Sequence, residues 1–322
     1  MLKKWISLML LTLLFTILVA CGQEETQEAN SSSGKEEAED TSQSTEINYL
    51  GETYEVPKDP SIVITGSLEA MEDALMLGVE PIGAISVGGE FPELYQEIVG
   101  SAESIGEKQQ PNLEKILELN PDVILSTTKF PEDVSSKLNE IATVIPVSHL
   151  STDWKDNLLL MGELSGDKEI AEQILADYDE QLEEIQAKAS EQLQDKTAVV
   201  VRIRSGNIMI YSQNTFFNPS LYEDFGLAVP SVVEAAEAQE AISLEKFSEV
   251  NPDYIFVQYA ESENADNPEA LSDLEVNPIW QSLQAVQNDQ VYVNVVDPLA
   301  QGGTAWSKIE FLKAFKENVL AE

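Results

Sequence analysis

Short apolar runs rich in β-branched residues alternate with stretches of helical spacing along most of the chain. The first series runs as strand 62–65, helix 68–77, strand 82–87, helix 113–119, strand 123–126, helix 131–139 and strand 144–147. The second has strands at 198–203, 208–211, 254–258 and 291–293, with helices at 220–225, 244–250 and 278–283. This alternation is typical of parallel sheets flanked by helices. It predicts an α/β protein with two lobes, each with a mainly parallel sheet flanked by helices.

One long segment without Gly or Pro, residues 167–194, separates the two series. Its apolar residues recur every three or four positions from Ile170 to Ile185, which predicts one amphipathic helix. At 1.5 Å per residue such a helix is roughly 40 Å long. We expect it to join an N-terminal lobe, residues 47–166, to a C-terminal lobe, residues 195–322.

An internal repeat supports the two lobes. Residues 113–125 align without gaps onto residues 244–256, and both segments contain Asn-Pro-Asp before an apolar triplet. The residue before a proline is pushed out of the helical region, so each segment predicts a helix that ends and a strand that enters a sheet.

The first residues are typical of an export signal. Lys3 and Lys4 precede an apolar core at 8–19, which stops at Ala20-Cys21-Gly22. A transmembrane helix needs roughly 20 apolar residues, so we predict that residues 1–20 are a cleaved signal peptide. The next residues, to about 46, are rich in Glu, Ser, Gln and Thr and predict a flexible tether over 21–46. Ordered structure is expected to begin with a hairpin at 47–56.

The mature chain is very acidic. The formal net charge is −40, and removal of Lys3 and Lys4 with the signal makes it −40 − 2 = −42. Such a surface repels nucleic acid and anionic lipid headgroups, so nucleic acid is excluded as a partner and any membrane contact must come from a lipid. Adaptation to high salt or high pH and attraction of a cationic partner both remain open as reasons for the acidity.

The residues needed for metal cages and common enzymes are scarce. The chain has one His, His149, and one Cys, Cys21, whereas transition-metal sites need several such residues, so no protein-held metal is predicted. It contains no phosphate-binding loop, nucleophile elbow, dinucleotide fingerprint or zinc-protease motif. We therefore expect a binding protein and not an enzyme; a hydrolase that pairs His149 with a serine is the alternative.

These features together resemble a known family. Leu18-Val19-Ala20-Cys21 resembles the bacterial lipobox, whose cysteine receives a diacylglyceryl group. The signal, the two lobes, the long helix and the repeated Asn-Pro-Asp pattern resemble the substrate-binding lipoproteins of ABC importers, in the class that serves iron–siderophores, haem and cobalamin. The resemblance covers the chain from about residue 61 to the end. It indicates the fold but does not indicate which ligand is bound.

The resemblance implies location, ligand and partners. It implies an extracytoplasmic monomer, lipid-anchored to the cell membrane through Cys21, that binds its ligand between the lobes and delivers it to an ABC permease. The expected ligand is a ferric siderophore of the hydroxamate or citrate-hydroxamate type, without a cofactor. Haem, cobalamin or ferric citrate is the alternative, although a single histidine weakens the case for haem.

The two arginines of the chain, Arg202 and Arg204, are the first candidates for ligand contact. Two positions apart on a strand, they share one face, and guanidinium groups suit an anionic or carbonyl-rich ligand. The resemblance implies that this Arg-x-Arg strand faces the ligand. Bonding of both arginines to local carboxylates is the alternative.

Ligands of parallel sheets lie beyond the carboxyl ends of the strands. This rule adds Ser67, Thr128, Lys129 and Tyr259 as candidates. Trp306 opens the last predicted helix and either lines the ligand site or packs in the core.

Two acidic residues are candidates for docking to the permease. Glu72 and Glu223 precede the turn glycines of equivalent lobe segments, 77–81 and 225–230. The resemblance implies that one acidic residue on each lobe meets arginines of the permease.

Overall fold

The computed structural model describes residues 44–320. The predicted signal peptide, Cys21 and most of the predicted tether lie outside the described residues. The first elements of the described residues are the strands of the antiparallel hairpin β1 (Ser44–Tyr49) and β2 (Glu52–Pro57). β1 therefore starts three residues before the predicted hairpin, because its polar first residues pair through the backbone, from Ser44 opposite Pro57 onward.

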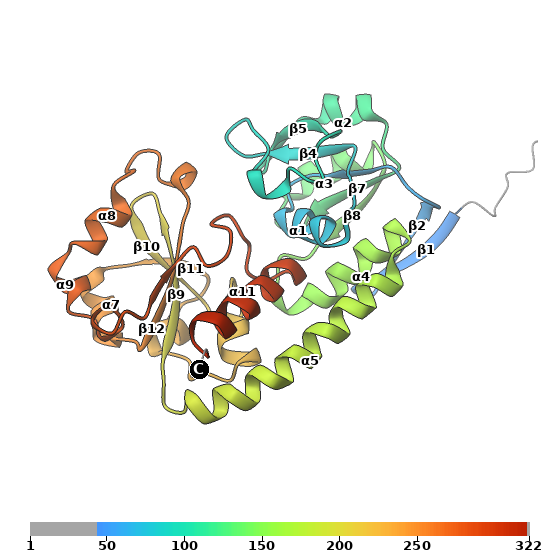
Figure 1. The fold of residues 1–322 in the computed structure, drawn as a ribbon. Coiled ribbons are helices and arrows are strands. Elements are labelled where there is room, and N and C mark those ends of the chain that lie inside the picture. Colours follow the sequence, from blue (N-terminus) through green and yellow to red (C-terminus); the bar gives the residue numbers. More distant parts are fainter. Residues whose placement is uncertain (1–43, 321–322) are drawn as a thin grey trace, which may run out of the picture. The chain divides into compact units, whose positions relative to one another are not determined.

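The N-terminal lobe contains a six-stranded sheet in the order β6-β5-β4-β3-β7-β8 (Figure 1). Its strands are β3 (Ile62–Ile64), β4 (Gly83–Ser86), β5 (Glu103–Glu107), β6 (Gln110–Pro111), β7 (Val123–Thr127) and β8 (Thr143–Val147). All neighbours are parallel except β5 and β6, which form an antiparallel hairpin. The sequence did not predict this hairpin, because its strands are short and contain mostly polar residues.

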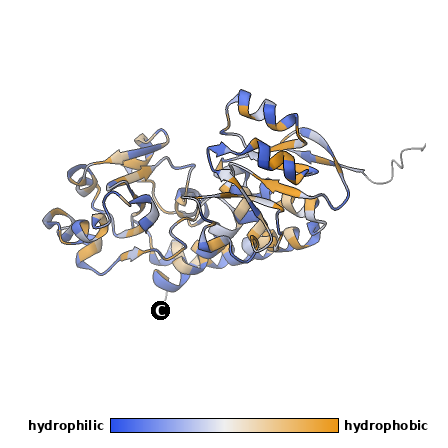
Figure 2. Ribbon diagram, turned by 90° about the horizontal axis from the view of Figure 1, so that it is seen from above, coloured by the Kyte–Doolittle hydropathy of each residue, from blue (hydrophilic) through white to orange (hydrophobic). Residues whose placement is uncertain are grey.

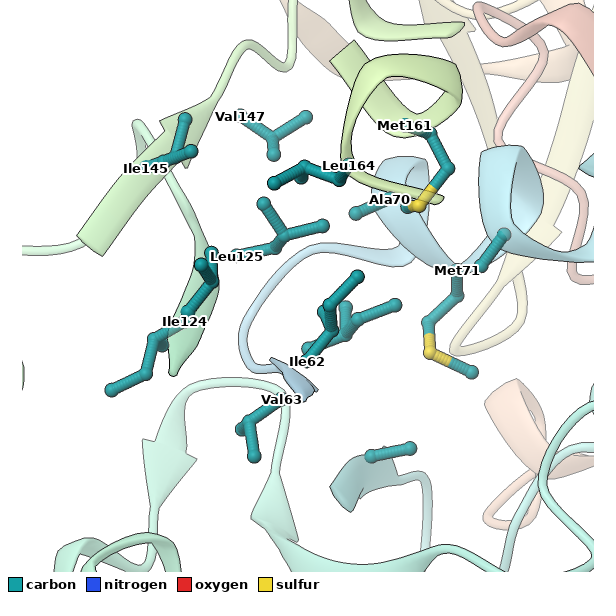
Figure 3. Close-up of a cluster of buried hydrophobic side chains, with 14 of the residues drawn as sticks. Ile62, Val63, Ala70, Met71, Ile124, Leu125, Ile145, Val147, Met161 and Leu164 are labelled. Carbon is teal, nitrogen blue, oxygen red and sulfur yellow. The ribbon is translucent and has the colours of Figure 1, made fainter. Parts of the chain in front are cut away.

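Four helices accompany this sheet, together with the short turn η1 (Glu93–Tyr95): α1 (Leu68–Leu77), α2 (Leu113–Leu119), α3 (Glu132–Asn139) and α4 (Trp154–Ser165). Figure 3 shows the core between them, where Ile62 and Leu125 of the sheet lie near Met161 and Leu164 of α4. Ala70 and Met71 bring α1 into the same cluster, so the inner face of α1 is fixed by apolar packing.

The C-terminal lobe contains a mixed five-stranded sheet in the order β11-β10-β9-β12-β13. Its strands are β9 (Ala198–Arg204), β10 (Asn207–Tyr211), β11 (Gln239–Ile242), β12 (Tyr254–Tyr259) and β13 (Val291–Val293). β9, β12 and β13 run parallel, whereas β9, β10 and β11 pair antiparallel. The antiparallel half follows from the two-residue turn Ser205-Gly206, in which both residues have positive φ, because so short a connection permits only a hairpin.

The elements around the second sheet are short except for the last helix. They are the single-turn helices η3 (Ser220–Asp224, a π-helix) and η4 (Glu261–Glu263), then α6 (Ser231–Ala235), α7 (Leu244–Val250), α8 (Ala270–Glu275), α9 (Pro278–Gln281), α10 (Gln284–Gln287) and α11 (Ala305–Asn318). The aromatic core of this region includes Phe217, Phe256, Phe311 and Phe315. It therefore fixes α11 against the sheet.

The long helix predicted over 167–194 is present as α5 (Lys168–Gln192), which follows the first sheet and precedes the second in the chain. Its buried residues include Ala171, Tyr178 and Ile185. Figure 2 shows hydrophobic and hydrophilic residues alternating along α5, as its amphipathic spacing requires. The helix packs against α4 and α11.

The two segments of the predicted repeat form the same helix–turn–strand arrangement in both lobes. α2 and α7 each end at an asparagine in the left-handed region, Asn120 and Asn251, before the Pro-Asp that leads into β7 and β12. The aspartates act alike: Asp122 accepts hydrogen bonds from the backbone N–H and hydroxyl of Ser61, and Asp253 accepts them from those of Thr197. Each aspartate thereby ties the start of its own strand to the start of a neighbouring one.

Candidate ligand-binding site

The arginines Arg202 and Arg204 lie at the end of β9 and share one partner, Glu263 of η4. Arg202 Nε lies 2.6 Å from Glu263 Oε2, and Arg204 Nε lies 3.5 Å from Glu263 Oε1. Arg202 is buried, donates a second hydrogen bond to the Pro298 carbonyl and lies over the ring of Phe216. Arg204 keeps half of its side chain exposed. Both arginines are therefore bonded to a local carboxylate, and Arg204 still presents its charge to solvent.

Two lysines of the N-terminal lobe lie near these arginines. Lys129 follows β7, and its Nζ lies 3.0 Å from Oε1 of Glu69 in the first turn of α1. Lys108 lies at the turn of the β5–β6 hairpin. Burial opposes the ionisation of Glu69, but the charges of Lys129 and Lys108 outweigh it and hold the pKa of this carboxyl below its usual value. Glu69 is therefore charged at neutral pH although it is buried.

The pKa of Lys108 is affected by cations of both lobes, which indicates that these cations lie in one region of the molecule. Burial lowers the pKa of Lys108, and the charge of Glu69 opposes this effect. The positive charges of Lys129, Arg202 and Arg204 lower it further. We call these four residues, Lys108, Lys129, Arg202 and Arg204, the cationic cluster. With the two carboxylates that contact it, its charge is 4 − 2 = +2, in a chain whose net charge is −40.

Lys108 is the residue of this site that sequence reasoning missed. It depends on the β5–β6 hairpin, whose turn is made possible by Gly106: its φ is positive, and a Cβ there would lie 2.6 Å from the Gln110 carbonyl oxygen. A glycine and a lysine in a polar stretch between two short extended segments were the available signals. Lys108 Nζ also donates to Oε1 of Gln301, at 3.4 Å.

Thr128 joins the site together with a residue that the sequence did not assign to it. Thr128 Oγ1 lies 2.7 Å from Nδ1 of His149, and both side chains remain at least partly exposed. Burial and the charge of Lys129 lower the pKa of His149, so its ring is neutral at neutral pH. The loop after β7 thus supplies one cation and one hydroxyl beside a neutral imidazole.

Three other sequence candidates have structural roles. Ser67 is fully buried as the N-cap of α1, where it accepts from the Ala70 N–H and donates to Glu69. Tyr259 donates its hydroxyl to the Pro268 carbonyl. Trp306 packs against the aromatic core of α11, as its packing alternative requires. The burial of the Ser67 hydroxyl as a helix cap argues against the ligand contact predicted for it.

The prediction for Glu72 is wrong, whereas Glu223 lies on the surface and stays a candidate. Glu72 is fully buried between α1 and the start of α11, where it accepts hydrogen bonds from the Gln301 N–H at 2.7 Å, from Ser307 Oγ at 2.5 Å and from the Thr304 hydroxyl. Burial raises its pKa to about 7, although these hydrogen bonds oppose the rise. A residue enclosed in this way cannot meet a permease.

Residues 44–320 contain neither a cluster of metal-binding side chains nor a helix able to span a membrane. No group of three or more His, Cys, Asp or Glu side chains there is placed to hold a metal ion. In the same part of the chain no helix is both long and apolar enough to cross a membrane.

Comparison with known proteins gives the scaffold its family. A family model described as periplasmic binding protein matches residues 63–294. The chain belongs to the periplasmic binding protein family. The family is extracytoplasmic, and its two-lobed α/β fold is the one described above.

Relatives within the family match this chain over nearly their whole length. The iron-uptake system-binding protein of Bacillus subtilis is 53% identical over 319 residues, which cover 98% of this chain and 99% of the relative. A crystal structure described as the triscatecholate siderophore binding protein FeuA from Bacillus subtilis, complexed with ferri-bacillibactin, has a TM-score of 0.81 and 55% identity over 85% of this chain and 97% of that one. Staphylococcus aureus SirA complexed with staphyloferrin B has a TM-score of 0.72 and 26% identity, over 86% and 99% of the two chains. The predicted family and fold are confirmed.

Proposed function

We propose that this chain is the siderophore-binding component of an ABC iron-uptake system and that its ligand is a ferric tris-catecholate. The cationic cluster carries the proposal. This cluster combines both arginines of the chain with two lysines, so it contains cations of both lobes. Such a group stands out in a protein with 58 acidic residues.

Charge distinguishes the ligand classes. Three doubly deprotonated catecholates around Fe(III) leave three negative charges on the complex, and their oxygens accept hydrogen bonds from ammonium and guanidinium groups. A ferric tris-hydroxamate is neutral and gains little from a cationic cluster. The catecholate therefore replaces the hydroxamate or citrate-hydroxamate that the sequence alone led us to expect. The 55% identity to the triscatecholate-binding FeuA supports the same choice.

Ferric citrate is the second candidate, because it is also anionic and a Bacillus subtilis protein described as Fe(3+)-citrate-binding is 23% identical to this chain. Its carboxylates can bind arginine and lysine side chains as well as catecholates can. No observation in the described residues favours haem or cobalamin.

Titration of tryptophan fluorescence with matched iron chelates tests the proposal. A ferric tris-catecholate should bind about a hundredfold more tightly than a ferric tris-hydroxamate of similar size, with an affinity that falls as salt rises, because the difference is electrostatic. Tighter binding of ferric citrate than of the catecholate would select the second candidate. Equal affinity for the neutral and anionic chelates would refute the proposal.

We further propose that a lipid on Cys21 and a permease partner complete the system. Since Glu72 is buried, the internal repeat offers a better docking pair: Glu114 and Glu245 occupy matching first-turn positions of α2 and α7 and are exposed in both lobes. A glutamate in the first turn also stabilises its helix through the helix dipole. An uptake assay therefore has to distinguish docking to the permease from this structural role.

Uptake of radioactive iron by cells that depend on this protein provides that assay. Glu114→Lys with Glu245→Lys should abolish uptake, while the purified variant binds the chelate normally. Cys21→Ala should release the protein into the medium. Glu118→Lys with Glu249→Lys, at other matching positions of the repeat, is the control, and equal loss of uptake in both pairs would refute the specific pair.

A further inference from the structure

In each lobe one carboxylate lies close to two cationic side chains. In the N-terminal lobe Glu69 contacts Lys129 at 3.0 Å and is near enough to Lys108 for the lysine charge to favour its ionisation. In the C-terminal lobe Glu263 contacts Arg202 at 2.6 Å and Arg204 at 3.5 Å. The side chains of Glu69 and Glu263 are only 7% and 16% exposed.

Two negative charges, one buried and one largely shielded from solvent, are unfavourable in a site that serves only to attract an anion. They cancel half of the positive charge of the cationic cluster, and each repels the ligand across a region of low dielectric constant. Their presence therefore calls for a function other than attraction.

Both carboxylates are fixed by backbone structure. Glu69 lies in the first turn of α1, and the N-cap Ser67 donates to its Oε2 at 3.4 Å. Glu263 lies in η4, whose backbone is tied to the end of β9 because the Glu263 carbonyl accepts from the Ser205 N–H at 3.0 Å. A fixed carboxylate restrains the long, flexible side chain of a lysine or arginine and reduces the entropy lost when that side chain contacts a ligand.

We propose that Glu69 and Glu263 are positioning residues that hold the four cations in fixed directions, and that they thereby restrict the site to a rigid, multiply charged chelate. The proposal rests on the proposed function, because it takes the cationic cluster as the ligand site. It predicts that removal of a negative charge from an anion-binding site weakens binding of the correct anion.

Kinetics of ferric tris-catecholate binding to Glu69→Gln, Glu263→Gln and the double variant test this prediction. The association rate should rise slightly with the added positive charge, whereas the dissociation rate should rise more, so that each single variant binds about tenfold more weakly. The double variant should also bind free citrate, a flexible anion, more tightly than the wild type does. Glu263→Asp, which keeps the charge, should recover part of the affinity.

Glu118→Gln is the matched control, because Glu118 pairs with Lys115 on the surface and should leave both rates unchanged. If the Gln variants bind the chelate more tightly, with an unchanged dissociation rate, Glu69 and Glu263 are counterions only and the proposal is wrong. A merely structural role would lower the stability of the variants without this rise in both rates.

A measurement without ligand separates this proposal from the proposed function. NMR signals of ordered lysine ammonium groups should be visible for Lys129 in the wild type and lost in Glu69→Gln. If that change occurs but no tris-catecholate binds, the ligand is wrong and the positioning role stands. If the signal is unchanged, Glu69 does not position Lys129.

Discussion

Two carboxylates one turn apart on α1, Glu69 and Glu72, are both buried but have opposite surroundings. Glu69 faces the ammonium groups of Lys129 and Lys108, whereas Glu72 faces the Gln301 N–H and the hydroxyls at the start of α11. The pKa of Glu69 is held below its usual value, and that of Glu72 is raised to about 7.

The difference shows what offsets the burial of a charge. Hydrogen bonds from hydroxyl and amide groups stabilise a carboxylate, but for Glu72 they do not compensate for complete burial. A neighbouring cation does compensate for it at Glu69. One helix thus carries a carboxylate that remains charged beside the cationic cluster and another that changes its charge near neutral pH where α1 meets α11.

Replacement of Glu72 by Gln should change the pH dependence of stability more than any other substitution at these two carboxylates. The folded-state pKa of Glu72 lies above its unfolded value, so its contribution to stability is present at low pH and is lost as pH rises to about 7 and beyond. Between pH 4.5 and pH 8 the stability of the wild type relative to Glu72→Gln should fall by about 3 kcal/mol, because one pKa unit corresponds to about 1.4 kcal/mol. Urea unfolding of both proteins at the two pH values measures this change.

Glu69→Gln is the control for this measurement. The pKa of Glu69 is lowered in the folded state, so its contribution is present above the unfolded pKa and is lost only as pH falls through the folded value. Relative to the wild type, the stability of Glu69→Gln should stay constant from about pH 5 to pH 8.

Burial and the charge of Glu72 raise the pKa of Asp73, so the two carboxyls interact electrostatically, and Glu72→Gln with Asp73→Asn tests this coupling. A constant difference between the wild type and Glu72→Gln would show that Glu72 is not protonated in the folded protein.

The same comparison shows what the sequence could predict. Local patterns sufficed for the alternating elements, for α5 and for the repeat, because each depends on residues close together in the chain. The rule that ligands lie beyond strand ends made Thr128 and Lys129 candidates, and the spacing of Arg202 and Arg204 on one strand predicted that they share one face.

The burial of Glu72 could not be predicted in this way. Its position in α1 looks like that of a surface residue, and what encloses it is the segment 301–307, more than 200 residues later in the chain. The same holds for Lys108, which reaches the cationic cluster only because a short polar hairpin extends the first sheet. Contacts between distant segments decide both cases: the local pattern around Lys108 indicates a turn, but it does not indicate what that turn lies beside.

The smallest expected effect on stability comes from Lys129→Met, which removes the cation from Glu69 and keeps the apolar stem. Lys129 is 45% exposed, and Glu69 can take up a proton once the cation is lost, so the effect on stability should be smaller than that of Glu72→Gln. The pKa of Glu69 should nevertheless rise, because Lys129 is its main cationic neighbour, and the affinity for the anionic chelate should fall about tenfold. An NMR titration of the Glu69 carboxyl and a binding titration measure the two changes, with Lys115→Met, at an exposed ion pair with Glu103, as control. An unchanged pKa of Glu69 would mean that Lys108 alone keeps this carboxyl charged, and the contrast with Glu72 would then depend on the hairpin and not on the loop after β7.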